Sequence, residues 1–76
     1  MSKLTPIRRK KFEKFLKFVG CTLKRTKGDH FIYDRPGLDR PVVITDDREV
    51  PVFIIRNNLR VLRISTDEFF QILREI

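Results

Sequence analysis

A single histidine, His30, is the residue in this sequence best suited to acid–base chemistry. It follows a Lys27-Gly28-Asp29 turn and opens a segment rich in strand formers. Imidazole has an unperturbed pKa of about 6.5, so it can both accept and release a proton near neutral pH. RNA cleavage needs little more, because the ribose 2′-hydroxyl is a built-in nucleophile and nearby cations can stabilise the phosphorane. His30 is therefore our candidate general acid–base, although these residues alone also fit an incidental surface histidine.

Positive charge is concentrated in the part of the chain that leads to this histidine. The 76 residues include 17 Lys and Arg against 10 Asp and Glu, a formal net charge of +7. Residues 1–30 hold ten basic and two acidic residues, a net +8, and residues 31–76 hold seven and eight, a net −1. This segregation favours contact with nucleic acid over a lysine-rich helix face that only aids solubility. A membrane surface fits less well, because the apolar face of this segment is needed for the core.

Two groups of these cations are candidate RNA-binding residues. The first group is close to the histidine and is expected to hold the scissile phosphate: Lys24, Arg25 and Lys27. The second group lies in a predicted helix and is expected to steer the RNA backbone: Lys10, Lys11 and Lys14.

Several other kinds of site are not indicated. The sequence lacks a glycine-rich phosphate loop, a His-Glu-x-x-His zinc helix and paired cysteines, so we expect neither a metal nor a small-molecule cofactor. Asp46, Asp47 and Glu49 are interpreted as solvating charge on one loop and not as Mg²⁺ ligands. With one cysteine, no apolar run near the ~18 residues of a membrane span, and no apolar signal segment, we expect a reduced cytoplasmic protein without a membrane partner.

Hydrophobic periodicity predicts the helices that must position the site. Thr5-Pro6 is typical of a helix start, and the apolar stripe after it predicts a first helix over residues 6–19. A second stripe predicts a helix over 52–63. Residues Ser65 to Glu68 form a capping box, which opens a last helix.

Three short strands are expected between the first two helices. Alternation over 21–26 and strand formers over 30–33, separated by a turn, predict a β-hairpin, and 41–45 is a third strand. His30 alternates with Phe31, so His30 is expected on the open face of the sheet if Phe31 is in the core. Together these elements predict one α+β domain over residues 1–76.

The predicted domain has two layers in the order α-β-β-β-α(-α), with a three-stranded antiparallel sheet covered by helices on one face. Tyr33 shares the face of Phe31, so a place in the core fits it better than stacking on a base. Cys21 opens a strand and is expected to be a small buried hydrophobe.

Several segments resemble the HicA (YcfA-like) family of toxins. They are Val19-Gly20-Cys21, the run from Lys24 to Tyr33, and the tail from Val50 to Ser65 followed by Glu68-Phe69. The likeness covers residues 7–73, and its one sharp motif is Gly28-Asp29-His30, where the family typically has Gly-Ser-His. The family's usual Pro-x-His after the third strand is Thr45-Asp46-Asp47 here, so a second histidine is absent. The Gly that follows the second helix in the family is Arg63.

The resemblance implies a fold similar to the double-stranded RNA-binding domain. It also implies metal-independent cleavage of mRNA by the histidine that matches His30, and neutralisation by a HicB antitoxin. On this interpretation the chain is a HicA-like endoribonuclease whose cations bind RNA. Two alternatives use the same fold: a module that binds structured RNA without turnover, and a degenerate toxin that serves only as the partner of an antitoxin.

Overall fold

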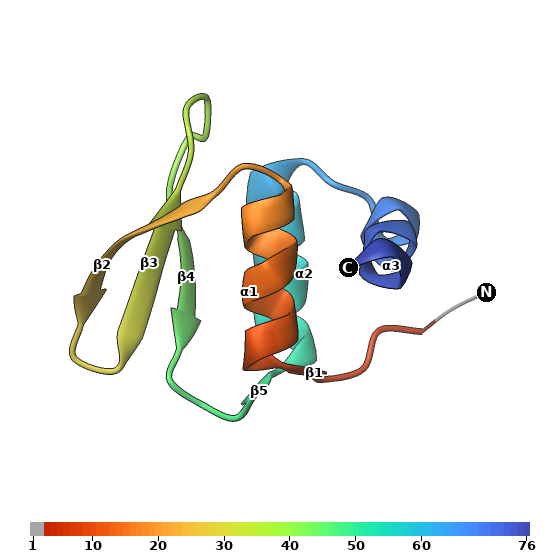
Figure 1. Cartoon of the computed structure of the whole chain (residues 1–76), viewed down its shortest axis with the longest axis horizontal. Helices are drawn as coiled ribbons and strands as arrows, with labels where there is room; N and C mark the ends of the chain where they lie inside the picture. The colour runs from red at the N-terminus through yellow and green to blue at the C-terminus, as the bar shows by residue number, and fades with distance from the viewer. Residues whose placement is uncertain (1–2) are drawn as a thin grey trace.

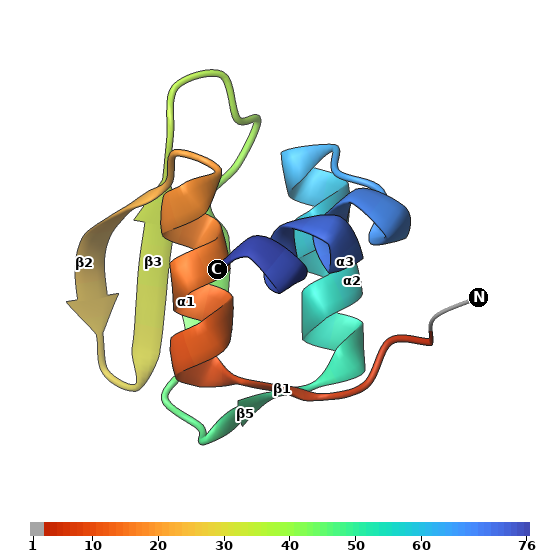
Figure 2. The ribbon, with the colours of Figure 1, turned by 45° about the vertical axis from the view of Figure 1, so that its right-hand side comes forward.

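The computed structural model describes residues 3–76, which form three helices, a three-stranded sheet and a two-stranded sheet (Figure 1). The elements in chain order are β1 (Ile7–Arg8), α1 (Arg9–Phe18), β2 (Thr22–Lys27), β3 (His30–Asp34), β4 (Val42–Thr45), β5 (Glu49–Val50), α2 (Val52–Leu62) and α3 (Thr66–Glu75). The larger sheet lies on one side of α1 and α2, and α3 lies on the side away from the sheet (Figures 1 and 2). The predicted α+β class and the order of its main elements, α-β-β-β-α-α, are confirmed.

The three-stranded sheet is antiparallel with the order β2-β3-β4, which confirms the predicted hairpin and third strand. Gly28 has a φ of 60° in the hairpin turn, a conformation that glycine adopts without steric strain. His30 is therefore in the central strand, flanked by Lys27 on β2 and by Thr45 on β4.

The core lies between this sheet and the helices. Phe12 and Phe15 of α1 and Phe69 of α3 are fully buried, with ring centroids 4.7 to 6.0 Å apart. From the sheet, Tyr33 and Ile44 are each 1% exposed. Because side chains alternate along a strand, the opposite face of β3 and β4 is left open to solvent at the end where the hairpin turns.

The start of the first helix differs from the prediction. Thr5-Pro6 does not begin it, because β1 pairs with β5 and holds Ile7 in extended conformation opposite Val50. The helix begins at Arg9, whose backbone N–H donates to the carbonyl oxygen of Arg48 at 2.9 Å. Tertiary strand pairing has overridden a local capping signal. The same strand pairing places Glu49, an acidic residue of the loop predicted after β4, in β5.

The last two helices match their predictions closely. Helix α2 covers Val52–Leu62, and Arg63 ends it in the left-handed conformation with a φ of 58°. Helix α3 begins with the predicted capping box, in which the backbone N–H of Glu68 donates to Ser65 Oγ at 3.1 Å.

An arginine in the β3–β4 loop joins the C-terminal ends of α1 and α2. Arg35 donates from Nη1 to the carbonyl oxygen of Val19 and from Nη2 to that of Leu62 at 3.3 Å. Carbonyl groups at a helix C-terminus lack intrahelical partners and carry partial negative charge, so a guanidinium there stabilises both helix ends. Arg35 thereby holds the two helices in register beside the sheet.

Candidate active site

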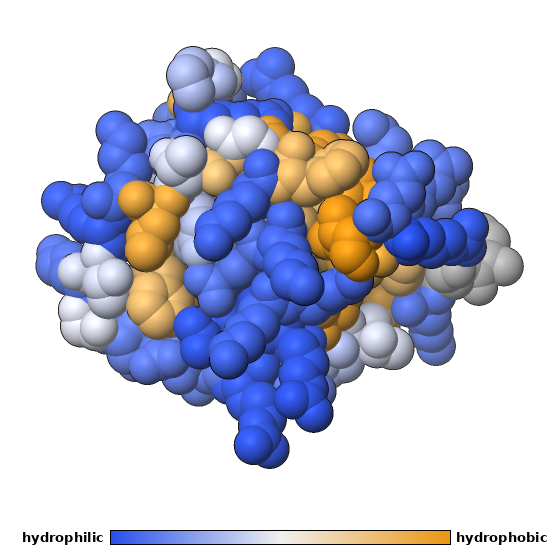
Figure 3. Space-filling model, in the orientation of Figure 1, coloured by the Kyte–Doolittle hydropathy of each residue, from blue (hydrophilic) through white to orange (hydrophobic). Residues whose placement is uncertain are grey.

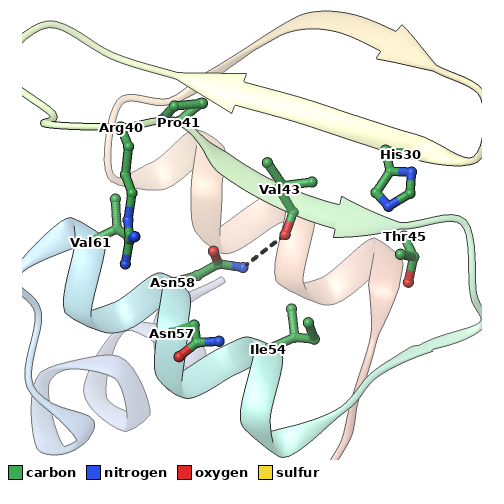
Figure 4. A pocket seen from close by; sticks show the side chains of 9 residues that line it. All are labelled: His30, Arg40, Pro41, Val43, Thr45, Ile54, Asn57, Asn58 and Val61. Atoms are coloured by element: carbon green, nitrogen blue, oxygen red, sulfur yellow. Dashed lines mark hydrogen bonds between the residues drawn. The ribbon is translucent and has the colours of Figure 1, made fainter.

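His30 is the first residue of β3 and directly follows the hairpin turn. Its side chain is 51% exposed, and it alternates away from the buried Tyr33. The open-face position predicted from strand alternation is what the structure has. In the close view the ring lies next to Thr45 at the end of β4 (Figure 4). A polynucleotide chain can therefore reach the imidazole.

Two of the predicted cations share the open face with His30. Lys27 is its cross-strand partner, and Arg25 pairs with Ile32 two residues further along β3. Side chains of directly opposite residues in an antiparallel pair are neighbours, with Cβ atoms about 4.5–5.5 Å apart. Both cations are exposed. A phosphate at the imidazole would therefore lie within reach of the Lys27 ammonium group.

The Asp29 carboxylate, which belongs to the hairpin turn, contacts the imidazole of His30. Its Oδ1 lies 3.0 Å from Nδ1 of His30, within hydrogen-bond distance. With a proton on Nδ1 shared with this carboxylate, Nε2 is the ring nitrogen left to face a ligand. The backbone carbonyl of Asp29 also accepts a hydrogen bond from the N–H of Asp46 at 2.7 Å, which fixes the turn to the end of β4.

Lys24 lies apart from His30. It is at the bulge in β2, between Leu23 and Arg25, and borders a hollow with residues near the C-terminal end of β3. His30 is at the other end of that strand. A phosphate bound at His30 would thus contact Lys27 and Arg25 before it contacts Lys24.

The three lysines of α1 are in the helical layer. Arg9 at the start of α1 lies over the ring of Phe31 on β3, with its Cζ 4.9 Å from the ring centroid. This contact places α1 on the core face of the sheet. Lys10 and Lys14 are exposed, and Lys11 donates from Nζ to the backbone carbonyl of the last residue. Hydrophilic side chains cover the region over α1 in Figure 3. The structure does not bring these lysines to the face that carries His30, and their steering of RNA stays a prediction.

Tyr33 is in the core, as predicted. It is 1% exposed, and its hydroxyl donates to Oε1 of Glu13 on α1. Burial, this hydrogen bond and the negative charge of Glu13 raise the pKa of the Tyr33 hydroxyl well above its usual value. Because Tyr33 points away from the open face, neither proton transfer at His30 nor stacking on a bound base is open to it.

Cys21 is also buried, as expected for a small apolar side chain. Its burial raises the pKa of the thiol, and the Asp34 carboxylate adds to this while the Arg35 guanidinium opposes it. A thiol in such surroundings is a poor nucleophile at neutral pH.

A groove between β4 and α2 was missed by the sequence analysis. Its volume is about 390 Å³, with His30 and Thr45 at one end and Arg40 at the other (Figure 4). Asn58 on α2 is 5% exposed and donates from Nδ2 to the backbone carbonyl of Val43 on β4 at 3.3 Å. The sequence signal for this contact is Asn58 itself, a polar residue among the apolar residues that α2 buries. A buried amide needs a hydrogen-bond partner, which here is the β4 backbone.

The acidic loop after β4 is occupied by internal contacts. Asp46 Oδ1 lies 3.5 Å from Nη2 of Arg9, and Asp47 Oδ2 accepts a hydrogen bond from the Thr45 hydroxyl at 2.6 Å. Across residues 3–76, no three side chains of metal-ligating type come together. No helix in the same range is both long and apolar enough to cross a membrane.

Comparison with known proteins identifies the family of this chain. A family model described as the HicA toxin of bacterial toxin–antitoxin systems matches residues 9–64, which run from the start of α1 past the end of α2. No curated protein and no solved structure matches the chain. The family match contains His30 and both walls of the groove and covers most of the 76 residues. The chain therefore belongs to the HicA toxin family, which gives it the role of the toxin in a bacterial toxin–antitoxin pair.

Proposed function

We propose that this toxin is a metal-independent endoribonuclease that cleaves mRNA, with His30 as its general acid–base. The observation that carries the proposal is the exposed imidazole on the open face of the sheet, with Lys27 directly opposite it and Arg25 two residues further along. Membership of the HicA family supports a nuclease, and Gly28-Asp29-His30 resembles the Gly-Ser-His motif typical of that family.

The proposed reaction is an intramolecular transesterification. Neutral His30 takes the proton of the ribose 2′-hydroxyl through Nε2, and the 2′-oxygen forms a bond to phosphorus. The bond from phosphorus to the 5′-oxygen then breaks, which leaves a 2′,3′-cyclic phosphate on one product and a 5′-hydroxyl on the other. Lys27 and Arg25 neutralise the charge on the phosphorane oxygens.

The leaving 5′-oxygen also needs a proton. The family's second histidine is replaced by Thr45-Asp46-Asp47 in this chain, and Tyr33 is buried. Lys27 and water are the two donors that fit the open face. Acid–base catalysis by the imidazole supplies about 10² to 10⁴ in rate, and the cations add to that.

A HicB-like antitoxin is the proposed protein partner, and the cytoplasm, where mRNA is translated, is the proposed site of action. The support for the partner is the family itself, whose toxins are paired with antitoxins, and the cytoplasm follows from the proposed substrate. Co-purification of the protein with the product of the adjacent reading frame tests the partnership.

The experiment that tests the catalytic proposal compares the protein with its His30→Ala variant on mRNA, with and without EDTA. We expect cleavage by the wild type that EDTA does not change, and a loss of about 10² to 10⁴ in rate in the variant. Since His30 is half-exposed and outside the core, thermal unfolding of the two proteins should coincide, which is the control for folding.

Other outcomes identify the alternatives. Equal cleavage by both proteins would remove His30 from the mechanism. Salt-dependent binding of RNA without cleavage by either protein would favour the non-catalytic binding module. Neither binding nor cleavage, together with tight binding of the antitoxin, would favour a degenerate toxin.

A further inference from the structure

We propose that the groove between β4 and α2 binds a short unpaired stretch of RNA that leads to the scissile phosphate. In this proposal Asn57 forms hydrogen bonds with the edge of one base, and Arg40 binds a backbone phosphate at the far end. The inference rests on the proposed function and names its substrate as single-stranded RNA. Its first support is position, because His30 forms one end of the groove (Figure 4).

The groove is long enough for more than one nucleotide. Its sheet side runs from Arg40, two residues before β4, to Thr45 at the end of β4, a span of five residue steps or roughly 16 Å at about 3.3 Å per residue. One strand of a double helix advances about 3.4 Å per nucleotide along the helix axis, and an unpaired strand can extend further. A strand that lies along β4 would therefore place one phosphate at His30 and a later one near Arg40.

The lining has the chemistry of a nucleotide site. None of the nine lining residues is acidic. The carboxylates at its His30 end, those of Asp29 and Asp47, are paired with the His30 ring and the Thr45 hydroxyl. Apolar side chains can contact the face of a base, and these are Pro41, Val43, Ile54 and Val61. Bases that leave the stack are held in proteins between aromatic or apolar side chains, combined with hydrogen bonds to their edges.

Two polar side chains in the groove have unused hydrogen-bonding groups. Asn57 is exposed and, within residues 3–76, its amide makes no hydrogen bond. Arg40 is exposed and forms no ion pair within the same residues. An amide presents both a donor and an acceptor, which matches base edges, and a guanidinium matches phosphate oxygens. The neighbouring Asn58 instead binds β4 and keeps the groove walls in place.

The arrangement favours single-stranded over double-stranded RNA. In a duplex the base edges are paired with one another, so Asn57 could not bind a Watson–Crick edge. In an unpaired strand the bases can turn away from the backbone into the groove while the phosphates stay outside.

Binding to an oligonucleotide that cannot be cleaved tests the inference directly. The probe is a short unstructured 2′-O-methyl RNA, which lacks the nucleophilic hydroxyl, titrated with the protein at several salt concentrations. We expect Asn57→Ala to weaken binding by about fivefold, the usual effect of a lost hydrogen bond. We expect Arg40→Ala to lower the slope of log affinity against log salt by about 0.7, the effect of one phosphate contact on a single strand.

Matched controls remove the same groups from outside the groove. Arg56→Ala removes an exposed arginine from α2, and Gln71→Ala removes an exposed amide from α3. Neither residue lines the groove, so both variants should bind the probe like the wild type. Groove variants that bind no more weakly than these controls would overturn the inference. Equally tight, equally sensitive binding of a duplex with the same sequence would overturn the single-strand assignment.

Cleavage mapping separates the failure of this inference from the failure of the proposed function. If Asn57→Ala cleaves one transcript at a changed set of sites while His30→Ala is inactive, both proposals are supported. If His30→Ala cleaves like the wild type but the groove variants still weaken binding, the catalytic role of His30 fails and the groove stands. If the wild type cleaves and Asn57→Ala matches it in sites, rate and probe binding, the groove proposal fails alone.

Discussion

His30 and Lys27 are direct cross-strand partners at the turn end of the β2–β3 hairpin. The turn formed by Gly28 and Asp29 brings these two side chains onto the same face of the sheet. An imidazole and an exposed lysine thus occupy adjacent positions on a face that solvent can reach. A phosphodiester bound there could contact both, which is what a transesterification at phosphorus requires.

Lys27→Ala is the first test of this pairing. We expect kcat/KM for RNA to fall by about 10- to 100-fold, because the phosphorane loses a cation positioned beside it. Initial rates on a fluorogenic RNA measure the effect. Lys17→Ala removes an equal charge from the exposed side of α1 and is the matched control. A similar loss in both variants would mean that Lys27 contributes only through net charge.

Asp29 is predicted to act as a positioning residue for the imidazole. Because both side chains are largely exposed, we expect Asp29→Ala to lower kcat by no more than about fivefold, the range of exposed ion pairs. Asp29→Asn keeps an acceptor for Nδ1 and should restore kcat. A change in KM alone, with no recovery in the Asn variant, would contradict the positioning role.

Tyr33 should make the fold sensitive to alkaline pH. Burial and the bond to Glu13 raise the folded-state pKa of Tyr33 above its unfolded value of about 10. The folded protein therefore keeps a proton that the unfolded chain releases, so this stabilisation is complete below about pH 10 and decreases as the pH rises further. Urea unfolding of the wild type and Tyr33→Phe should show a stability gap that shrinks by up to about 1.4 kcal/mol per pH unit above 10. A gap that stays constant with pH would contradict the burial of this hydroxyl.

Arg35 is predicted to be the main polar contributor to stability outside the sheet. Arg35→Ala removes the contacts with the carbonyls of Val19 and Leu62, and we expect a loss of about 1–3 kcal/mol in the free energy of unfolding. Arg74→Ala, an exposed arginine on α3, is the control and should change stability little. Equal stabilities of the two variants in urea would show that the helix ends do not depend on Arg35.

Patterns that are local in the sequence predicted the fold and the position of His30 well. Strand alternation predicted that His30 and Tyr33 point to opposite faces of the sheet. The capping box at Ser65 predicted the start of α3. Each of these features is determined by neighbours a few residues apart. The helix start predicted at Thr5-Pro6 failed because a distant segment, Glu49–Val50, pairs with the chain just after it.

The groove could not be predicted from the sequence, because it depends on how α2 is placed beside β4. Asn58 and Val43 are 15 residues apart, and their hydrogen bond sets that placement. The contacts of Arg35 with two helix ends are non-local in the same way. Arg63 is a smaller example, since its backbone is left-handed, a conformation that favours glycine, and the residue type alone did not indicate it.

The most direct measurement of the central claim is the chemistry of the ends that cleavage leaves on RNA. A defined transcript is incubated with the wild type in EDTA, and the product ends are identified by phosphatase sensitivity and mass spectrometry, with His30→Ala in parallel. Catalysis by the His30 imidazole predicts 2′,3′-cyclic phosphate and 5′-hydroxyl ends that disappear in the variant. Ends with a 3′-hydroxyl and a 5′-phosphate, or undiminished products from His30→Ala, would contradict it.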